Sequence, residues 1–239
     1  DSTSIDSDSS LLPTNISLRG KKIGIVKEFF GKGIDKNVAS AVEMKISEME
    51  KEGAKIEEIS LPLNAEYGIS VYYLIAVSEA STNLARYSGM RYGAHSDLEG
   101  TFDEYFSKVR TENFGKEAKR RILLGTFARM SGFRDAYYLR AMKARTLLIN
   151  EYKKAFKKFD CLVHPSMPIV APEFSEIEKL TPLQNYAMDL CTVPANLGGF
   201  PHISINAGLA GKMPVGMMLT SDHLQEKTML EIAQGAESL

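Results

Sequence analysis

Two observations predict an α/β fold for this 239-residue chain. The first is a β-branched run at residues 21–26, followed by a helical pattern at residues 35–52 and a second strand pattern at residues 55–61. Strand, helix and strand in such close succession form a βαβ unit, which implies a parallel pair of strands. The second observation is that strand patterns alternate with helical ones in the last third of the chain. Interleaved strands and helices are typical of α/β proteins.

The first helix has recognisable start and stop signals. Asp35 is expected to cap its N-terminus, because a short acidic side chain accepts hydrogen bonds from the first free amides of a helix. Gly53 suits the position after the C-terminus, where φ is often positive. Between them, apolar residues recur at helical spacing. These residues are Val38, Val42, Ile46 and Met49.

The remaining segments predict a mainly helical middle and a return to strands. Residues 1–17 are rich in Ser and Asp, which predicts an extended tail or linker ahead of a folded part at residues 18–239. Gly198 and Gly199 are expected in a helix-to-strand turn, where positive φ or close packing is a better explanation than phosphate binding. Helices are predicted at residues 65–92, 101–110, 114–131, 137–159 and 181–190 and from Asp222 onward, and strands at residues 160–165, 202–207 and 214–219.

Composition excludes several classes of protein. Lys and Arg total 29 against 30 Asp and Glu, so the net charge of −1 draws the whole chain neither to nucleic acid nor to an anionic membrane, although a local patch still could. No apolar run is long enough to span a bilayer. No signal peptide is expected at the amino terminus. The chain begins without Met, so we expect it to start partway through a longer gene product.

The cysteines and histidines predict no metal site. Cys161 and Cys191 are isolated in apolar sequence, and we expect two buried free thiols in a reducing compartment, the cytoplasm, with a disulfide as the second interpretation. The four histidines are scattered without ligand spacing.

Three features are candidates for chemistry, although no complete active-site motif is present. The basic cluster at residues 116–121 is either a solvated face or the source of one inward arginine, and Arg121 is the better candidate because apolar residues follow it. The run at residues 153–158 is interpreted as a solvated face rather than an RNA contact. Asp189 lies among apolar residues, so its carboxylate needs a partner, either a helix end or the ammonium group of a ligand. An inward Arg and an inward Asp together suit an α-amino acid.

The sequence resembles the carboxy-terminal half of the amidase signature family, and within it the glutamine-hydrolysing A subunits of glutamyl-tRNA(Gln) amidotransferases. Matching segments run nearly from end to end, and the blocks at residues 79–86 and 119–122 are specific to these subunits. The segments are Asp1-Ser2-Thr3-Ser4, Lys22-Ile23-Gly24-Ile25, Tyr72-Tyr73, Ser78 to Tyr87, Arg91-Tyr92-Gly93, Phe114-Gly115, Lys119 to Thr126, Asp135 to Tyr138, Val193 to Leu197, Pro201 with Ser204, and Pro214-Val215-Gly216.

The resemblance implies a mixed β-sheet covered by helices on both faces and lacking its amino-terminal half. It also implies a ligase, an amidotransferase in which this chain's subunit releases ammonia from glutamine. A B subunit would use ATP and Mg to convert Glu-tRNA(Gln) or Asp-tRNA(Asn) to the amidated form, and a C subunit would brace the heterotrimer. By the matching motifs, Arg121 would bind the carboxylate of glutamine, Asp189 its ammonium, and Tyr72 would line the site.

The resemblance assigns no catalytic residue, no cofactor and no metal to this chain. The family's nucleophilic Ser, bridging Ser and Lys belong to a Gly/Ser-rich core upstream of the segment matched by Asp1 to Ser4, so we expect the chain alone to be inactive. It departs from the family pattern at Ser88, Ser166-Met167 and Met217-Met218. Two alternatives stay open: a stand-alone amidase for another amide, and a non-catalytic binding or assembly module.

Overall fold

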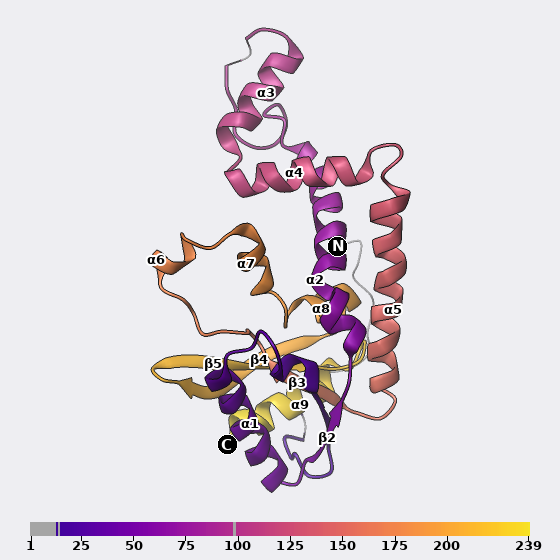
Figure 1. Ribbon diagram of the computed structural model, residues 1–239, viewed down its shortest axis with the longest axis vertical. Helices are drawn as coiled ribbons and strands as arrows, with labels where there is room; N and C mark the ends of the chain where they lie inside the picture. Colours follow the sequence, from indigo (N-terminus) through magenta and orange to yellow (C-terminus); the bar gives the residue numbers. More distant parts are fainter. Residues whose placement is uncertain (1–12, 14, 98) are drawn as a thin grey trace. The chain divides into compact units, whose positions relative to one another are not determined.

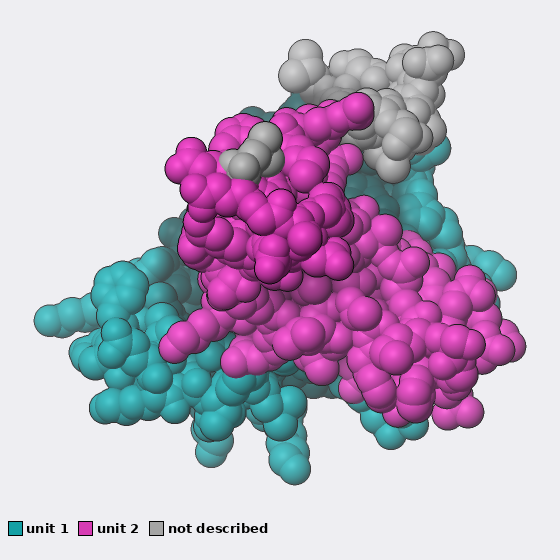
Figure 2. All heavy atoms as spheres, turned by 90° about the horizontal axis from the view of Figure 1, so that it is seen from above, with its two compact units in different colours: residues 1–69, 147–239 teal, residues 70–146 magenta. Residues whose placement is uncertain are grey.

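The described part of the chain divides into two compact units. The computed structural model describes residue 13, residues 15–97 and residues 99–239. Unit 1 comprises residues 1–69 and 147–239, and unit 2 comprises residues 70–146 (Figure 2). Most of the tail predicted at residues 1–17 lies outside the described residues. Among the described residues, no helix combines the length and the apolar character that crossing a membrane requires.

Unit 1 is built on a mixed five-stranded sheet, which confirms the α/β prediction. Its strand order is β2-β1-β3-β5-β4. β1 pairs in parallel with both β2 and β3, whereas β5 pairs antiparallel with β3 and β4. The parallel pair of the predicted βαβ unit is therefore present. The strands are β1 (Lys22–Val26), β2 (Lys55–Ile59), β3 (Cys161–Pro165), β4 (His202–Ala210) and β5 (Met213–Thr220).

Helices cover both faces of this sheet (Figure 1). Successive side chains of a strand point to opposite faces. Cys161 and Val163 of β3 accordingly pack in a cluster with residues of α1 (Lys36–Lys51) and α9 (Glu226–Glu237). Leu162, between them, packs in a second cluster with Tyr152 of α5 (Arg140–Ala155) and with Phe200. The sheet is thus the centre of two apolar cores.

The ends of α1 confirm the local signals of the sequence. Oδ1 of Asp35 accepts hydrogen bonds from the amides of Asn37 at 2.8 Å and Val38 at 3.2 Å. Gly53, two residues after the last residue of α1, has φ +94°. A side chain there would be strained, so the glycine permits the reversal into β2.

Unit 2 is helical in its described residues. It contains the larger part of α2 (Pro62–Asn83), a 3₁₀ turn (Leu84–Arg86), α3 (Phe102–Asn113), α4 (Lys116–Arg129), a π-helical turn (Asp135–Leu139) and the first residues of α5. Gly125 of α4 lies against α2 so closely that an added Cβ would overlap the carbonyl oxygen of Val77. A glycine is therefore required where the two helix backbones meet.

Three predicted helices have an end that lies four or more residues from the predicted one. The helix expected at residues 65–92 ends at Asn83 and its 3₁₀ turn at Arg86, because Gly89 has φ +81° and its carbonyl accepts a hydrogen bond from the Tyr105 hydroxyl. The helix expected to reach residue 159 ends at Ala155. The last helix begins at Glu226 rather than Asp222.

Two short helices carried no recognised sequence signal, a 3₁₀ helix (Lys27–Phe30) and α6 (Phe174–Ile177). A third, α8 (Val193–Gly198), is the helix that the predicted helix-to-strand turn implies. α7 (Pro182–Ala187) lies within the helix predicted at residues 181–190. The turn predicted at the glycine pair is present, since Gly199 ends α8 with φ +68°.

Candidate functional site

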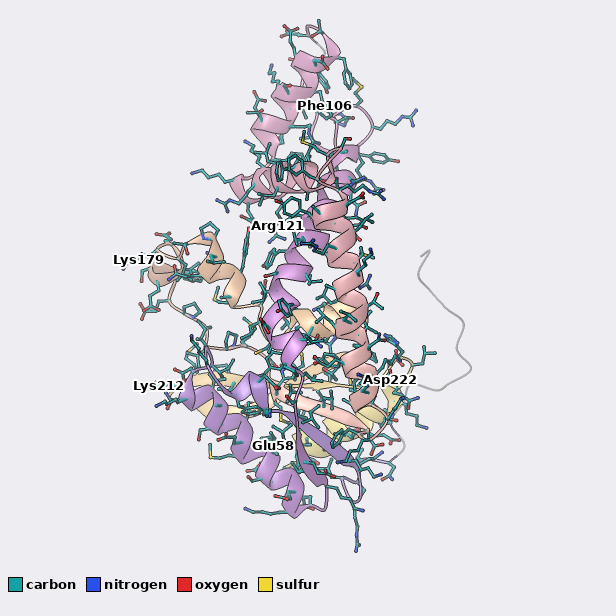
Figure 3. All side chains as sticks on the ribbon, turned by 45° about the vertical axis from the view of Figure 1, so that its right-hand side comes forward. Glu58, Phe106, Arg121, Lys179, Lys212 and Asp222 are labelled. Carbon is teal, nitrogen blue, oxygen red and sulfur yellow. The ribbon has the colours of Figure 1, made fainter. Side chains whose placement is uncertain are left out.

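Arg121 projects from α4 (Figure 3) and is only one-third exposed. Its Nε donates a hydrogen bond to Oε1 of Glu117 at 2.9 Å, one helical turn earlier. Its guanidinium carbon lies 5.7 Å from the centroid of the Tyr73 ring, within the range of a cation–π contact. Leu123 and Leu124, the apolar residues that singled out this arginine, are themselves 72% and 48% exposed. The guanidinium is therefore held by a carboxylate and an aromatic ring rather than by its apolar neighbours.

Glu117 is shared by two arginines. Arg120, the neighbour of Arg121, forms an ion pair with Oε2 of the same carboxylate, and its side chain is 44% exposed. One carboxylate between two guanidinium groups leaves an excess of one positive charge at this point of α4. Exposed pairs of this kind contribute little stability. Of the two interpretations of the basic cluster, the solvated face fits the more exposed Arg120 better than it fits Arg121.

Two consecutive tyrosines of α2 belong to this neighbourhood. The rings of Tyr72 and Tyr73 lie 5.1 Å apart and nearly perpendicular, the edge-to-face arrangement that aromatic rings prefer. Tyr72 was the residue singled out from the sequence, but Tyr73 is the one that contacts Arg121. Glu117 was not anticipated from the sequence either, although its position four residues before Arg121 is the spacing of a helical ion pair.

Asp189 lies in unit 1, in the turn between α7 and α8, and is half-buried. Its carbonyl accepts hydrogen bonds from the amides of Thr192 at 3.1 Å and Val193 at 3.0 Å and from the Thr192 hydroxyl at 3.2 Å. The Asp189 carbonyl thus accepts a hydrogen bond from the amide of the first residue of α8, Val193. Tyr72 and Arg121 belong to unit 2, so these two are the predicted residues placed within one compact unit.

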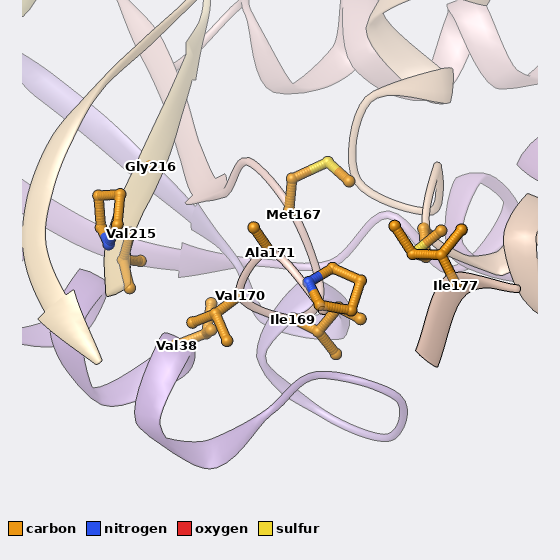
Figure 4. Close-up of a pocket in the computed structure, with 11 residues that line it drawn as sticks. Val38, Met167, Ile169, Val170, Ala171, Ile177, Val215 and Gly216 are labelled. Atoms are coloured by element: carbon orange, nitrogen blue, oxygen red, sulfur yellow. The ribbon is translucent and has the colours of Figure 1, made fainter. Parts of the chain in front are cut away.

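The residue before Asp189 lines an apolar pocket in unit 1. This pocket has a volume of about 380 Å³ and is lined by Met188, Met167, Ile177 and Val215 among others, with no charged side chain in its lining (Figure 4). An amino acid brings two charged ends, which this lining alone does not match. The pocket instead suits the apolar stem of a ligand or the side chain of another segment.

The buried titratable groups of unit 1 are poor nucleophiles. Burial raises the pKa of Cys161 and that of Cys191 to about 12 each, so both are protonated thiols at neutral pH. Both are free, which excludes the disulfide considered as the second interpretation. Burial lowers the pKa of His164 to about 4 and keeps its imidazole neutral. Among the described residues, no group of His, Cys, Asp and Glu side chains is arranged to hold a metal ion.

A mixed sheet covered by helices on both faces is the arrangement that the resemblance predicted. The sequence matches the model of the Amidase family over residues 1–230, and the chain belongs to the amidase family.

The similar proteins give a narrower comparison. The chain is 46% identical over 220 residues to the A subunit of the glutamyl-tRNA(Gln) amidotransferase of Heliobacterium modesticaldum, a match that covers 92% of this chain and 45% of that protein. It is 42% identical over 240 residues to the protein of the same name from Staphylococcus epidermidis, covering 100% of this chain and 49% of that protein. The chain thus spans less than half the length of these relatives.

Solved structures agree with this result. The crystal structure of the glutamyl-tRNA(Gln) amidotransferase A subunit from Thermotoga maritima superposes with a TM-score of 0.69 at 29% identity, over 92% of this chain and 42% of that one. A crystal structure described as an amidase superposes with a TM-score of 0.74 at 21% identity, over 96% of this chain and 47% of that one. The second match shows the fold alone.

Proposed function

We propose that this chain supplies the glutamine-recognition residues of an amidotransferase subunit that releases ammonia from glutamine for the amidation of Glu-tRNA(Gln) or Asp-tRNA(Asn). The observation that carries the proposal is the 40–46% identity, across 90–100% of this chain, to proteins named as the A subunit of glutamyl-tRNA(Gln) amidotransferase. The proposed location is the cytoplasm, where aminoacyl-tRNA is used.

Free glutamine differs from other amides in carrying both a carboxylate and an ammonium group. In this proposal, Arg121 binds the carboxylate and Asp189 the ammonium, while Tyr72 lines the site. The geometry of Arg121 supports its part, because Glu117 and Tyr73 already fix the orientation of the guanidinium. A preoriented guanidinium loses less entropy when it binds a carboxylate through two hydrogen bonds. Recognition of both charged ends would reject neutral amides.

In this proposal, residues outside this chain carry out the chemistry of hydrolysis and of amidation. No residue of this chain is proposed as the nucleophile or the base, and the chain is proposed to need no cofactor of its own. The partners proposed are a B subunit, which would use ATP and Mg to activate the tRNA-bound carboxylate, and a C subunit. These assignments rest on the family resemblance of the sequence.

The test is glutamine hydrolysis by a full-length subunit that carries this chain as its carboxy-terminal half, in complex with its B and C subunits. Arg121→Ala is expected to lower kcat/KM for glutamine by about 10- to 150-fold, since a hydrogen bond to a charged group contributes about 1.5–3 kcal/mol. Arg120→Ala is the matched control, because it removes an arginine that pairs with the same Glu117. The two variants should have equal melting temperatures.

Three outcomes would count against the proposal. Equal glutamine turnover in the Arg121 and Arg120 variants would remove the carboxylate role. Hydrolysis of neutral amides as fast as glutamine would favour the stand-alone amidase instead. Ammonia release by the purified 239-residue chain, above that of a boiled sample, would contradict the absence of catalytic residues from it.

A further inference from the structure

A second pocket, which is polar, lies entirely within unit 2. Its volume is about 360 Å³, and its walls come from the last turns of α2, the end of α4 and the π-helical turn. Three charged side chains line it: Glu79 from α2, Arg129 from α4 and Arg134, which immediately precedes the π-helical turn. Thr82 and Tyr138 add hydroxyl groups. None of these five residues belongs to the glutamine site proposed above.

One wall of the pocket is formed where α2 and α4 pack against each other. Arg129 donates a hydrogen bond from Nη1 to the Ser78 carbonyl at 3.4 Å. The same carbonyl accepts the Ser81 hydroxyl at 2.8 Å and the Thr82 hydroxyl at 3.5 Å. Gly125 brings the two helices together one turn before Arg129. The pocket therefore stands on two packed helices, which hold functional side chains more accurately than loops do.

The three charges of the pocket are not neutralised by one another. None of the ion pairs among the described residues includes Glu79, Arg129 or Arg134. All three residues are exposed. Unit 2 as a whole carries 13 Lys and Arg against 8 Asp and Glu, whereas the whole chain has a net charge of −1. The pocket thus presents two cations and one anion to solvent in the basic part of the molecule.

This charge pattern selects a class of ligand. A phosphate group would find two guanidinium groups but also the carboxylate of Glu79, which repels it. A molecule with two carboxylates and one ammonium group would match all three charges. The volume lies at the small end of the range for ligand pockets, about 300–1,000 Å³, and suits a molecule of amino-acid size.

We propose that this pocket binds a small acidic α-amino acid, with Arg129 and Arg134 on its two carboxylates and Glu79 on its ammonium group. The Tyr138 hydroxyl donates a hydrogen bond to a carboxylate oxygen. The inference rests on the residues of the pocket and does not depend on the proposed function.

The experiment is calorimetric titration of the 239-residue chain with L-glutamate as the probe. Because the proposed glutamine site could also take up glutamate, every variant is made in an Arg121→Ala background. Saturable binding is expected to persist in that background. Arg134→Gln is expected to weaken it at least about tenfold, the effect of losing one charged hydrogen bond. Arg140→Gln, the loss of an exposed arginine outside the pocket lining, should leave it unchanged.

A second arm tests the ammonium contact. Glutarate, which has the two carboxylates but no ammonium, should bind more weakly than L-glutamate to the Arg121→Ala chain, and adding Glu79→Gln should abolish that difference. Arg129→Gln is a weaker test, because Arg129 also bonds α2. Arg134→Gln decides the matter, since no hydrogen bond or ion pair of the Arg134 side chain occurs among the described residues.

The proposal is overturned by any of three results. These are no saturable binding in the Arg121→Ala background, equal affinity in the Arg134 and Arg140 variants, or binding of inorganic phosphate or glutarate as tight as that of glutamate. None of them bears on glutamine hydrolysis. Conversely, loss of the Arg121 effect on glutaminase activity would leave this pocket's binding untouched.

Discussion

The burial of His164 leads us to expect that acid lowers the stability of the folded chain. This residue of β3 is fully buried against the ring of Phe29, at 4.8 Å between ring centroids. Its Nδ1 donates a hydrogen bond to the Pro165 carbonyl at 2.8 Å, and its Nε2 has no partner among the described residues. Burial is the main cause that lowers the pKa of His164 from 6.5 to about 4.

The sign follows from proton binding. Between pH 6.5 and 4 the unfolded chain takes up a proton at His164 that the folded chain excludes, so acid favours unfolding. With a pKa of about 4 in the folded chain and 6.5 in the unfolded chain, the loss is about 2 kcal/mol at pH 5 and approaches about 3 kcal/mol near pH 4. This contribution is fully present above pH 6.5.

The assay is urea unfolding of the chain at about pH 7 and about pH 5, followed by circular dichroism. His164→Gln cannot titrate, so its loss of unfolding free energy between the two pH values should be smaller than that of the parent chain by about 2 kcal/mol. His95→Gln retains His164, so it should keep the part of the loss that comes from His164. Carboxylates titrate in all three proteins, so the comparison is between differences. Equal losses in the parent and in His164→Gln would refute the reasoning.

Three further predictions concern packing, capping and thiol reactivity. Gly125→Ala should destabilise the chain by about 2 kcal/mol or more, because its Cβ overlaps a carbonyl of α2, whereas Gly115→Ala, with open space around it, should not; equal thermal midpoints would contradict this. Asp35→Ala should cost about 1 kcal/mol through loss of the α1 cap, and an unchanged urea midpoint would count against it. Cys161 and Cys191, with pKa values raised by burial to about 12, should react with a thiol reagent at mildly alkaline pH only after unfolding; rapid modification of the native chain would show that either thiol is accessible.

The elements that were predicted well are those whose ends are encoded locally. Asp35 and Gly53 lie next to the helix that they delimit, and both act as expected. The helix expected to continue through residues 87–92 failed for the opposite reason. Tyr105 bonds the carbonyl of Gly89 from sixteen residues away, and no local pattern contains that partner. The predicted helix start at Asp222 was wrong for a similar reason. The Asp222 carboxylate accepts hydrogen bonds from the His223 amide and the Lys153 ammonium rather than capping a helix.

The candidate site was predictable to the extent that it lies on one helix. The spacing of Glu117 and Arg121 is visible in the sequence, whereas the contact with Tyr73 depends on how another helix packs against α4. Family resemblance supplied Tyr72, and it favoured the ammonium role of Asp189 over the helix end that the residues alone left open. Both roles stay predictions.

Net charge shows why averages over a sequence mislead about binding. A value of −1 gave no reason to expect an affinity for anions, yet residues 70–146 carry 13 basic and 8 acidic residues, a formal charge of +5. Even this local excess does not by itself choose a ligand. On α4, Glu117 engages both Arg120 and Arg121 and removes part of the positive charge. In the polar pocket, Glu79 shares the lining with two arginines and penalises a simple anion. In both places one carboxylate turns a general attraction for negative charge into a requirement for a particular arrangement of charges, and such an arrangement is what distinguishes an amino acid from a polyanion.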